Sequence, residues 1–376
     1  MKILHIYKDY YPVLGGIENH VKVLAEAQAA AGHEVIVSVC NQGLASVEEV
    51  HNGVRILKSG RLTTAASMPL SLRQPLTIRR IRADIVHVQS PYPLGEVGAW
   101  LLQSRTPLVL SYQSDVVRQK NILRFYGPLL KRVLQRADCI LANSPRYIDS
   151  SPWLQPVKEK CRVVPIGVDA TRFHPPARPY AGPPRLLFVG RLRYYKGLDT
   201  LIAAMAELPV EVTLDIAGTG PLYETLAAQV ARLGLESRVR FLQEVSDESL
   251  PKLYQQASLF VLPSNARSEA YGIVLVEAMA SGLPCVSTEL GTGTSWLVQE
   301  GVTGRVVPPR DPAMMAAAIR DLLADPERLC AMGRAARARV EGELTQECMV
   351  NRILEIYEEL LHQGTTSRTS RVFMVS

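Results

Sequence analysis

Short apolar runs alternate along the chain with longer segments in which apolar residues recur every three or four positions. The runs predict β-strands, and the spaced segments predict amphipathic helices. Alternating strands and helices are typical of parallel sheets covered by helices, so the pattern predicts an α/β fold. In the first half, strands are predicted over 2–7, 34–40, 85–88, 108–111 and 139–142, and helices over 18–31 and 122–134.

A proline-rich segment interrupts this alternation near the middle of the chain. Six prolines fall between Val163 and Gly190, and proline ends both helices and interior strands. We therefore predict an N-terminal domain over 1–170, a linker over 171–183 and a C-terminal domain over 184–345. Two such domains would both offer strand-end loops to a ligand in the cleft between them. In the second domain, strands are predicted over 186–189, 212–217, 259–262 and 285–287, and helices over 198–208 and 272–280, followed by a helix over 346–362 and a disordered tail over 363–376.

Composition and charge exclude several classes of protein. The 376 residues are 47% apolar, yet no apolar run approaches the roughly 20 residues of a membrane span, and the N-terminus reads as a strand rather than a signal peptide. The six cysteines are widely spaced, which disfavours a disulfide framework or a zinc site and favours a cytoplasmic location. Residues 1–180 carry a net charge of +10 and residues 181–376 one of −4, so an anionic partner is expected for the first half only. Scattered basic residues with few aromatics disfavour nucleic acid.

Gly15 and Gly16 lie between the first predicted strand and the first predicted helix. Glycines there let the backbone approach a ligand closely, and the following helix presents free amides and the positive end of its dipole. The pair therefore marks either an anion-binding site or a plain flexible turn. The pattern G-x-x-x-x-G-K-[ST] is absent, as is G-x-G-x-x-G after the first strand, which disfavours an ordinary kinase or dehydrogenase.

Arg191 and Lys196 follow the first strand of the second domain, in the sequence LLFVGRLRYYKGLD. Solvated loop charge is the ordinary interpretation of such residues. However, the chain contains no D-x-D motif, and a diphosphate leaving group must be neutralised by a metal ion or by protein cations and helix ends. Both side chains are therefore candidates to bind a diphosphate without a metal ion.

Glu269 and Glu277 are eight positions apart in ARSEAYGIVLVEAMASGLP, which spans about 12 Å along a helix. That is about the length of a sugar–diphosphate–ribose unit, so one carboxylate would hold sugar hydroxyls and the other the ribose diol. A solvated helix face is the alternative, but the surroundings of Glu277 are too apolar for it. The residues that would open the helix, with amides facing the phosphates, are Tyr271, Gly272, Ile273 and Val274.

These motifs together resemble family 4 of the retaining glycosyltransferases. The resemblance rests on FVGRLRYYKGLDTL, DIAGTGPLYETL, the Glu269–Glu277 spacing and GLPCVST, with YPVLGGIENH and PIGVDATRFHP before them. It implies the GT-B fold: two Rossmann-like domains facing across a cleft, with the C-terminal helix crossing back to the first. It also implies metal-independent transfer that needs no cofactor besides the nucleotide-sugar donor. By motif, Gly16, Arg191 and Lys196 would bind the donor diphosphate, Glu269 the sugar, Glu277 the ribose, and the loop with Val245 the base.

Narrower motifs resemble bacterial enzymes that build O-antigens and exopolysaccharides, many of which use GDP-mannose or a GDP-deoxyhexose. These motifs are YKDYYPVLGGIE, LSYQSDVVRQK and STELGTGTSWLV. The second motif also departs from the family, because Gln113 stands where relatives usually have a histidine that contacts the donor sugar. Glutamine can donate a hydrogen bond as imidazole does, but it cannot carry a proton. Gln113 and Glu269 are the catalytic candidates, with Asp115 next to be considered.

The segment 116–136 is basic and amphipathic, with six Lys and Arg residues around an apolar stripe. A core-facing helix with a solvated polar side is one interpretation. The other is attraction to anionic lipid headgroups, which would place the protein peripherally on the inner face of the plasma membrane.

The sequence as a whole predicts a hexosyltransferase that uses a GDP-sugar and a lipid-linked or oligosaccharide acceptor. The resemblance to the O-antigen and exopolysaccharide enzymes implies that the sugar is mannose or a related sugar. Alternatives are a UDP-sugar-dependent transferase of the same family, an epimerase of the same architecture, and a nucleotide-sugar-binding protein impaired at Gln113.

Overall fold

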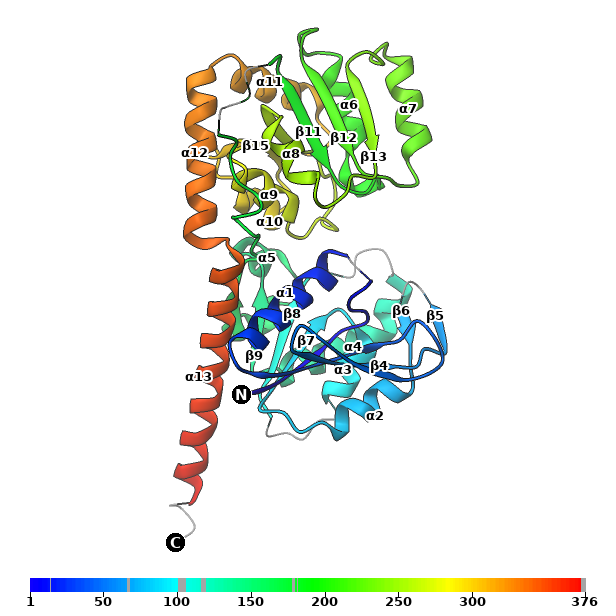
Figure 1. Cartoon of the computed structure of the whole chain (residues 1–376), viewed down its shortest axis with the longest axis vertical. Coiled ribbons are helices and arrows are strands. Elements are labelled where there is room, and N and C mark those ends of the chain that lie inside the picture. Colours follow the sequence, from blue (N-terminus) through cyan, green and yellow to red (C-terminus); the bar gives the residue numbers. More distant parts are fainter. Residues whose placement is uncertain are drawn as a thin grey trace. The chain divides into compact units, whose positions relative to one another are not determined.

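The computed structural model describes residues 1–13, 15–65, 68–100, 106–115, 120–177, 180 and 182–372, without the side chains of 65, 120–125 and 364–372 (Figure 1). The chain divides into two compact units. Unit 1 comprises Met1–Asn143, Ser151–Val164 and Met349–Ser376, and unit 2 comprises Ser144–Ser150 and Pro165–Cys348.

Unit 1 is built on an eight-stranded sheet in which all neighbours are parallel except the last pair. Its central strands are buried along their length, which explains why they read as short, nearly continuous apolar runs. The strand order is β10 (Cys161–Val163), β9 (Cys139–Ala142), β8 (Leu108–Tyr112), β7 (Ile85–Ser90), β1 (Lys2–Ile6), β2 (Glu34–Cys40), β4 (Val54–Ser59) and β3 (Val47–His51). A separate hairpin pairs β5 (Thr63–Ala65) with β6 (Met68–Leu70).

The helices of unit 1 include one from the far end of the chain. Gly32, with φ of +86°, follows the first helix in the left-handed conformation that commonly ends helices. The last helix, α13, starts in unit 2 and belongs to unit 1 from Met349 onwards. The helices are α1 (Gly16–Ala30), α2 (Arg73–Arg80), α3 (Pro93–Trp100), α4 (Lys120–Arg136) and α13 (Gln346–Val372), with a 3₁₀ segment η1 (Gln155–Lys160).

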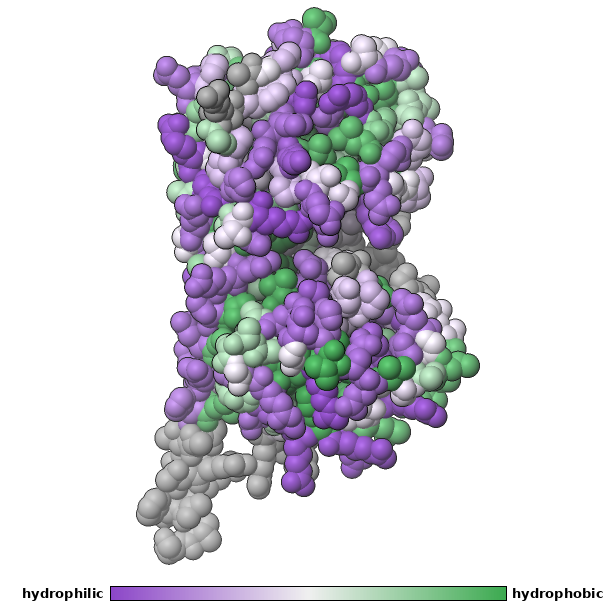
Figure 2. Space-filling model, in the orientation of Figure 1, coloured by the Kyte–Doolittle hydropathy of each residue, from purple (hydrophilic) through white to green (hydrophobic). Residues whose placement is uncertain are grey.

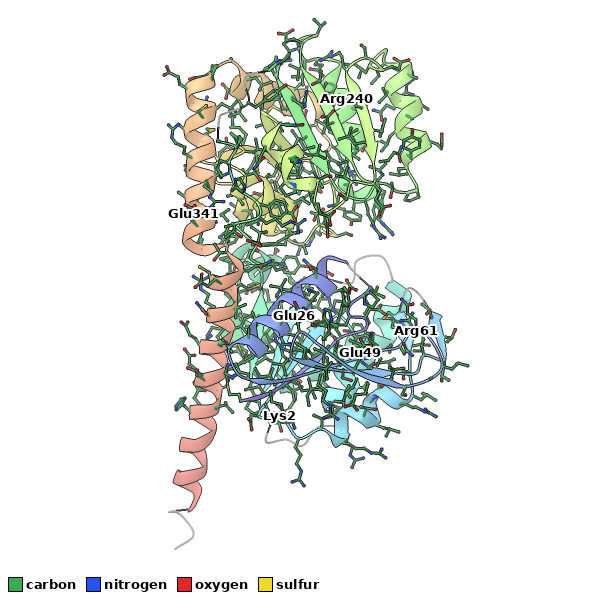
Figure 3. All side chains as sticks on the ribbon, viewed as in Figure 1. Lys2, Glu26, Glu49, Arg61, Arg240 and Glu341 are labelled. Carbon is green, nitrogen blue, oxygen red and sulfur yellow. The ribbon has the colours of Figure 1, made fainter. Side chains whose placement is uncertain are left out.

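Unit 2 is built on a six-stranded, fully parallel sheet. Its order is β13 (Val239–Gln243), β12 (Thr213–Ala217), β11 (Arg185–Val189), β14 (Leu259–Leu262), β15 (Cys285–Thr288) and β16 (Gly304–Val307). Arg240, labelled in Figure 3, joins the first two strands through a bidentate pair with buried Asp215, with both N–O distances at 2.7 Å.

Helices surround this second sheet, and the apolar residues of all of them except α5 and η2 are part of one continuous core with it. They are η2 (Tyr194–Lys196), α5 (Pro145–Ser150), α6 (Leu198–Met205), α7 (Tyr223–Arg232), α8 (Leu250–Gln255), α9 (Ile273–Ala280), α10 (Gly293–Leu297), α11 (Pro312–Leu323) and α12 (Pro326–Glu343). Among the residues that the structure describes, no helix is long and apolar enough to cross a bilayer.

The division into units differs from the predicted domains in three places. Unit 2 takes over at Pro165 rather than in the linker predicted over 171–183, because the residues from Val168 onwards already pair and pack with it. It also takes Ser144–Ser150, which the sequence assigned to the first domain. The tail predicted to be disordered from 363 is instead helical to Val372, since each further helical residue adds one backbone hydrogen bond at little extra cost. Residues 373–376 of that tail lie outside the described part of the chain, as does Ala181 of the predicted linker.

Candidate functional site

Lys196 and Glu269 form a buried ion pair in unit 2. Lys196 Nζ lies 2.6 Å from Glu269 Oε2, and each residue is only 8% exposed. Ser264 Oγ donates to the same carboxylate oxygen at 3.2 Å. Burial acts to lower the pKa of Lys196, but the charge and hydrogen bond of Glu269 outweigh it, so the pKa of Lys196 is raised. Lys196 therefore stays a full cation at neutral pH.

Gly197 explains why this lysine reaches the end of β14. It adopts φ of +65°, and a Cβ there would collide with the backbone carbonyl of Pro263, the residue after β14. The amide of Asn265 also donates to the Tyr195 carbonyl at 2.8 Å. These contacts fix the 3₁₀ turn η2 against the loop that carries Ser264 and Glu269. The local sequence of neither segment specifies that the two lie together.

The first turn of α9 follows directly after this loop. Gly272 precedes the helix with φ of +85°, where any other residue would be strained. The first N–H groups of a helix have no partner within it, so the amides of Ile273 and Val274, which are partly exposed, can donate to an anion. Tyr271 differs from its neighbours: its side chain is buried and its hydroxyl donates to the Ile166 carbonyl at 3.0 Å. Its side chain is therefore structural, and only its backbone is left to serve a ligand.

Glu277 lies one helical turn further along α9 and is only half-buried. Tyr254 of α8, which is fully buried, donates its hydroxyl to Glu277 Oε2 at 2.7 Å. Burial raises the pKa of Glu277 to about 7, although the Tyr254 hydrogen bond and the more distant charge of Arg172 act to lower it. This carboxyl thus changes its charge close to neutral pH.

The other predicted residues of unit 2 are more open to solvent. Arg191 is exposed in the loop between β11 and η2. Val245 is partly exposed in the loop after β13. All the predicted residues of unit 2 follow the carboxyl ends of parallel strands or lie on the helix after β14, which is where ligands of such sheets bind.

Gly15 and Gly16 mark the start of α1 in unit 1, Gly15 as the N-cap and Gly16 as the first helical residue. A Cβ on Gly15 would collide with Glu18 Oε2, whereas one on Gly16 would meet nothing within 4 Å. Lys8 Nζ lies 3.4 Å from Glu18 Oε1. The first turn of α1 therefore already holds a carboxylate of its own, and an anion bound there would share the helix end with Glu18.

Gln113 follows β8 and is held by a hydrogen bond that the sequence did not predict. Its Nε2 donates to Gln89 Oε1 at 2.7 Å, and its backbone amide donates to the Ser90 carbonyl at 2.9 Å. Gln113 is 8% exposed and Gln89 is fully buried, so the orientation of the Gln113 amide is set from inside the unit. Asp115, two residues on, accepts hydrogen bonds from the hydroxyls of Tyr112 at 3.0 Å and Ser151 at 2.7 Å.

Behind Gln89 lies a cluster of buried histidines. His87 hydrogen-bonds with Ser111 Oγ at 2.7 Å and with the Tyr357 hydroxyl of α13 at 2.6 Å, and its ring centroid is 5.2 Å from that of His5. Burial lowers the pKa of His5 and His20 to about 4, and the pKa of His87 falls well below its usual value. The three rings are neutral at physiological pH, and they serve the packing of unit 1.

Tyr254, Ser264 and Gln89 are the polar residues that sequence reasoning missed. Ser264 could have been found, because it comes two residues after a predicted strand. Gln89 also left a signal, as a polar residue at the end of an apolar strand in HVQS. Tyr254 left none, because its contact with Glu277 joins two helices that only the fold brings together.

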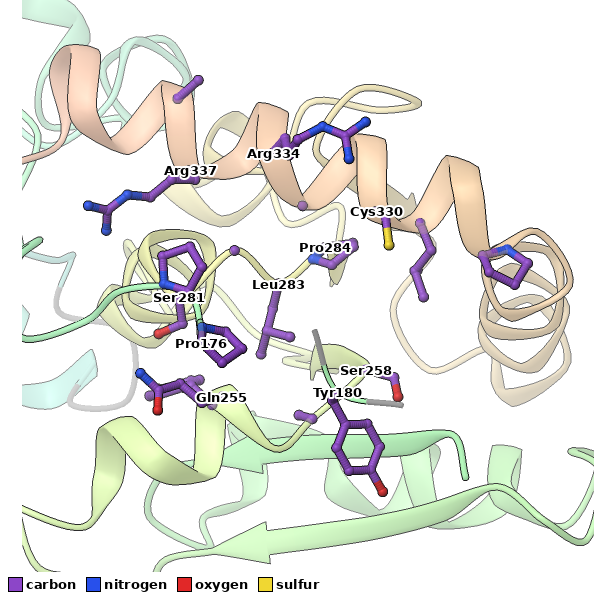
Figure 4. Close-up of a pocket in the computed structure, with 18 of the residues that line it drawn as sticks. Pro176, Tyr180, Gln255, Ser258, Ser281, Leu283, Pro284, Cys330, Arg334 and Arg337 are labelled. Carbon is purple, nitrogen blue, oxygen red and sulfur yellow. The ribbon is translucent and has the colours of Figure 1, made fainter. Parts of the chain in front are cut away.

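The residues that the structure describes offer no metal site, and one pocket of unit 2 lies apart from the predicted residues. Among the described residues, no group of three or more His, Cys, Asp or Glu side chains could hold a metal ion. A pocket of about 470 Å³ lies beside α12 and is lined by prolines and aliphatic residues together with polar and charged side chains such as Gln255, Arg334 and Arg337 (Figure 4). The described residues around it include Tyr254 but none of the residues predicted from the sequence, so it lies behind Glu277 rather than in the polar site.

Comparison with known proteins assigns both halves of the chain. Residues 14–172 match the family described as Glycosyltransferase Family 4, and residues 169–339 match the one described as Glycosyl transferases group 1. The D-rhamnosyltransferase of Pseudomonas aeruginosa is 37% identical over 355 residues, which cover 90% of this chain and 91% of that protein. The O-antigen chain mannosyltransferase C of Escherichia coli is 33% identical over 372 residues, 96% of this chain and 99% of that protein.

Solved structures show the same fold at lower identity. Sucrose-phosphate synthase from Thermosynechococcus elongatus superposes with a TM-score of 0.78 at 24% identity and covers 96% of this chain and 99% of that one. HepE of Anabaena, solved in complex with UDP, has a TM-score of 0.74 at 22% identity and covers 96% and 100%. These neighbours show the GT-B fold with two Rossmann-like sheets, which confirms the predicted fold class.

Proposed function

Because the chain belongs to glycosyltransferase family 4, we propose that it transfers a hexose from a nucleotide sugar to a saccharide acceptor with retention of configuration. The sugar is mannose or a related deoxyhexose, carried on GDP. The names of the rhamnosyltransferase and mannosyltransferase relatives support this choice, and the O-antigen relative supports a lipid-linked or polysaccharide acceptor.

The observation that carries the proposal is the buried Lys196–Glu269 pair. A nucleotide sugar presents a dianionic diphosphate next to a ring of hydroxyl donors, and this pair offers a cation and a carboxylate side by side. Lys196 has three N–H donors, and a carboxylate has about four lone-pair sites, so each can serve a ligand while paired to the other. Lys196 would hold the diphosphate and Glu269 the sugar.

The remaining predicted residues of unit 2 would bind the other parts of the donor. Arg191 would add a second cation, and the amides of Ile273 and Val274 at the α9 N-terminus would add neutral donors. Negative charge grows on the diphosphate as the sugar leaves, and preorganised cations stabilise that charge most where it is largest. In this proposal the protein therefore needs no metal ion. Glu277, on the next turn of α9, would accept the ribose hydroxyls, and the loop with Val245 would contact the base.

Gln113 would orient the sugar rather than exchange a proton with it. One N–H of its amide is donated to Gln89, which leaves the second N–H of the same nitrogen for a sugar oxygen. The amide has no ionisation near neutral pH, so it adds no pH dependence to the rate between pH 5 and 8.

The experiment is a transfer assay with the full chain, a panel of GDP- and UDP-sugars, and lipid-linked acceptor from a polysaccharide-producing bacterium. We expect transfer from a GDP-hexose, an α-linked product from an α-linked donor by NMR, and unchanged rates with EDTA. Inversion of the anomeric centre would overturn retention, and loss of activity with EDTA would overturn the metal-free mechanism. Use of UDP-sugars alone would replace GDP in the proposal.

A second candidate is a nucleotide-sugar-binding protein without transfer, and the glutamine at 113 is the observation that favours it. Donor binding by calorimetry without transfer to any acceptor would establish that function. Donor converted to an epimer without acceptor would instead indicate an epimerase. Gln113→His should introduce a pH dependence near pH 6.5, whereas Gln113→Ala should transfer more slowly than either, because it leaves Gln89 and the sugar without their partner. A Gln113→Ala variant as active as the native chain would remove this residue from the reaction.

A further inference from the structure

Helix α2 of unit 1 has its polar and apolar residues reversed relative to an ordinary surface helix. It buries Gln74 and Ile78, while Leu72 at its N-cap and Leu76 are 74% and 55% exposed. Gln74 is fixed inside because its Nε2 donates to the carbonyls of Tyr7 at 3.1 Å and Ser38 at 3.2 Å. Since residues four apart share a helix face, this anchoring turns Leu72 and Leu76 together towards solvent.

The exposed face of α2 is also strongly basic. Arg73, Arg79, Arg80 and Arg82 are all exposed, and the segment 72–82 contains no acidic residue. Arg73 precedes Leu76 by three positions, and Arg79 and Arg80 follow it by three and four, so arginines flank the leucines on one side of the helix.

Helix α3 packs against α2 and adds an exposed tryptophan. A Cβ on Gly98 would lie 2.7 Å from Ile78 Cδ1, so the two helices approach as closely as a glycine allows. Trp100, at the end of α3, is 46% exposed. The acidic residue of α3, Glu96, is fully buried and accepts hydrogen bonds from Ser90 and Tyr126, so it contributes no negative charge to the surface.

We propose that this basic apolar face, made of Leu72, Arg73, Leu76, Arg79, Arg80 and Trp100, docks on the surface of an anionic lipid membrane. Leucines that enter the headgroup region, arginines that reach lipid phosphates from apolar stems, and tryptophan at the boundary are the side chains that such a surface binds. The segment 72–82 carries four arginines and no acidic residue, so its charge complements the phosphates of anionic headgroups. Figure 2 shows hydrophobic residues interspersed with hydrophilic ones over this edge of unit 1.

This assignment moves the predicted membrane contact from α4 to α2. In the described part of α4, the apolar residues Tyr126, Leu130, Val133 and Leu134 are buried in unit 1 and cannot enter a bilayer. Over these residues α4 is a core-facing helix, which is the first of the two interpretations that the sequence allowed. The inference goes beyond the transfer reaction, and its test uses no sugar donor or acceptor.

The test is binding of the full chain to large vesicles of phosphatidylcholine with about 30% phosphatidylglycerol, measured by sedimentation. Each arginine near an anionic surface contributes about fivefold to the partition coefficient, and each inserted leucine on the order of tenfold. We expect Arg79→Gln/Arg80→Gln to bind about 25-fold more weakly, and Leu72→Ser/Leu76→Ser about 100-fold more weakly. Native binding should fall steeply with salt and be lost on pure phosphatidylcholine.

Matched controls keep charge and exposure constant elsewhere. Arg232→Gln/Arg334→Gln removes two exposed arginines from unit 2, and Leu44→Ser/Val50→Ser removes side chains of unit 1 that are 74% and 72% exposed. Both should bind as the native chain does. Blue-shifted tryptophan fluorescence on vesicles should disappear in Trp100→Phe, which separates contact by this face from contact elsewhere.

The proposal is overturned if the native chain does not bind anionic vesicles, or if the control pairs lose as much binding as the α2 pairs. It is also overturned if the α2 pairs bind normally, or if they abolish a dimer seen by size exclusion without altering vesicle binding, which would assign the face to a second copy. Equal melting temperatures of all variants exclude misfolding as the cause of a loss.

Discussion

The carboxyl ends of the strands carry different kinds of polar side chain in the two units. In unit 2 the edge is charged: Lys196 is held as a cation by Glu269, and Glu277 titrates near neutral pH. In unit 1 the predicted residue at that edge, Gln113, is neutral and binds Gln89, and the histidines behind them are kept uncharged by burial. The units have the same architecture, so the difference lies in the side chains placed at the strand ends.

The comparison teaches how burial acts on polar groups. A buried charge survives when an opposite charge is within contact distance, and otherwise the group takes its neutral form. Unit 2 supplies the partner for Lys196, and unit 1 supplies none for His20, both of whose ring nitrogens are buried without a hydrogen-bond partner in the described structure. At the carboxyl edges of the sheets, unit 2 therefore offers an anionic ligand a stabilised cation, whereas Gln113 of unit 1 offers a neutral hydrogen-bond donor.

Acid should break the comparison first, because the buried histidines of unit 1 take up protons when the unit unfolds. The pKa of His5 and His20 is lowered to about 4, so the unfolded state binds more protons and the stability of unit 1 is lost as pH falls from about 6.5 to 4, by roughly 3 kcal/mol for each ring. Hydrogen exchange by mass spectrometry at several pH values, corrected for intrinsic rates, should show unit 1 opening first. His20→Leu should remove the contribution of one of the three buried histidines, while His362→Leu, at an exposed position, should not; equal acid sensitivity of all three proteins would contradict this account.

Breaking the buried ion pair should have the next largest effect. Glu269→Gln leaves the Lys196 ammonium buried without its carboxylate, which should lower the free energy of unfolding by about 3 kcal/mol. The double variant Lys196→Met/Glu269→Met should be more stable than Glu269→Gln, because neither charge remains. Urea unfolding measures both. The control is Glu34→Gln, which breaks the exposed Lys2–Glu34 pair of 2.7 Å and should cost no more than about 1 kcal/mol; an equal loss in both pairs would show that burial is not the cause.

Arg191→Ala should sharpen the comparison by changing ligand binding without changing stability. Arg191 is exposed, so its loss should leave the melting temperature unchanged while weakening GDP binding by about 1.5–3 kcal/mol through a lost charge-assisted contact. Isothermal titration calorimetry measures the affinity. Arg193→Ala, also exposed in the same loop, is the matched control. If both variants bind GDP equally well, Arg191 does not contact the diphosphate.

Protonation of Glu277 should give the smallest of these effects, a pH dependence of nucleotide affinity that is specific to unit 2. In the proposed function its carboxylate accepts the ribose hydroxyls, and its pKa is raised to about 7, so nucleotide affinity should fall by up to tenfold per pH unit below 7. The raised pKa also means that its contribution to stability is present below pH 4.5 and lost as pH rises through 7, opposite to the histidines. Calorimetry of the native chain and Glu277→Gln at each pH cancels the titration of the nucleotide phosphate. A native pH dependence retained in the variant would assign the titration to another group.

Local sequence was sufficient for the elements with strong apolar patterns. The strands β2, β9 and β14 start and end where the pattern places them. It failed for β3 and β13, whose side chains are partly exposed and polar, and for the short helices α2 and α3. In α2 the apolar residues point outwards and a glutamine points inwards, so no periodicity rule could identify its buried face.

The sequence by itself determined the fold class, the order of the motifs and the residue types at the strand ends, because these follow from periodicity and from spacing along one segment. Only the tertiary structure decided which of those residues meet. Glu269 is paired with Lys196, Glu277 with Tyr254, and Gln113 with Gln89, each across 23 or more positions of chain. Such contacts depend on which strands neighbour one another in the sheet, and that order is fixed by the packing of the whole unit rather than by any one stretch of sequence.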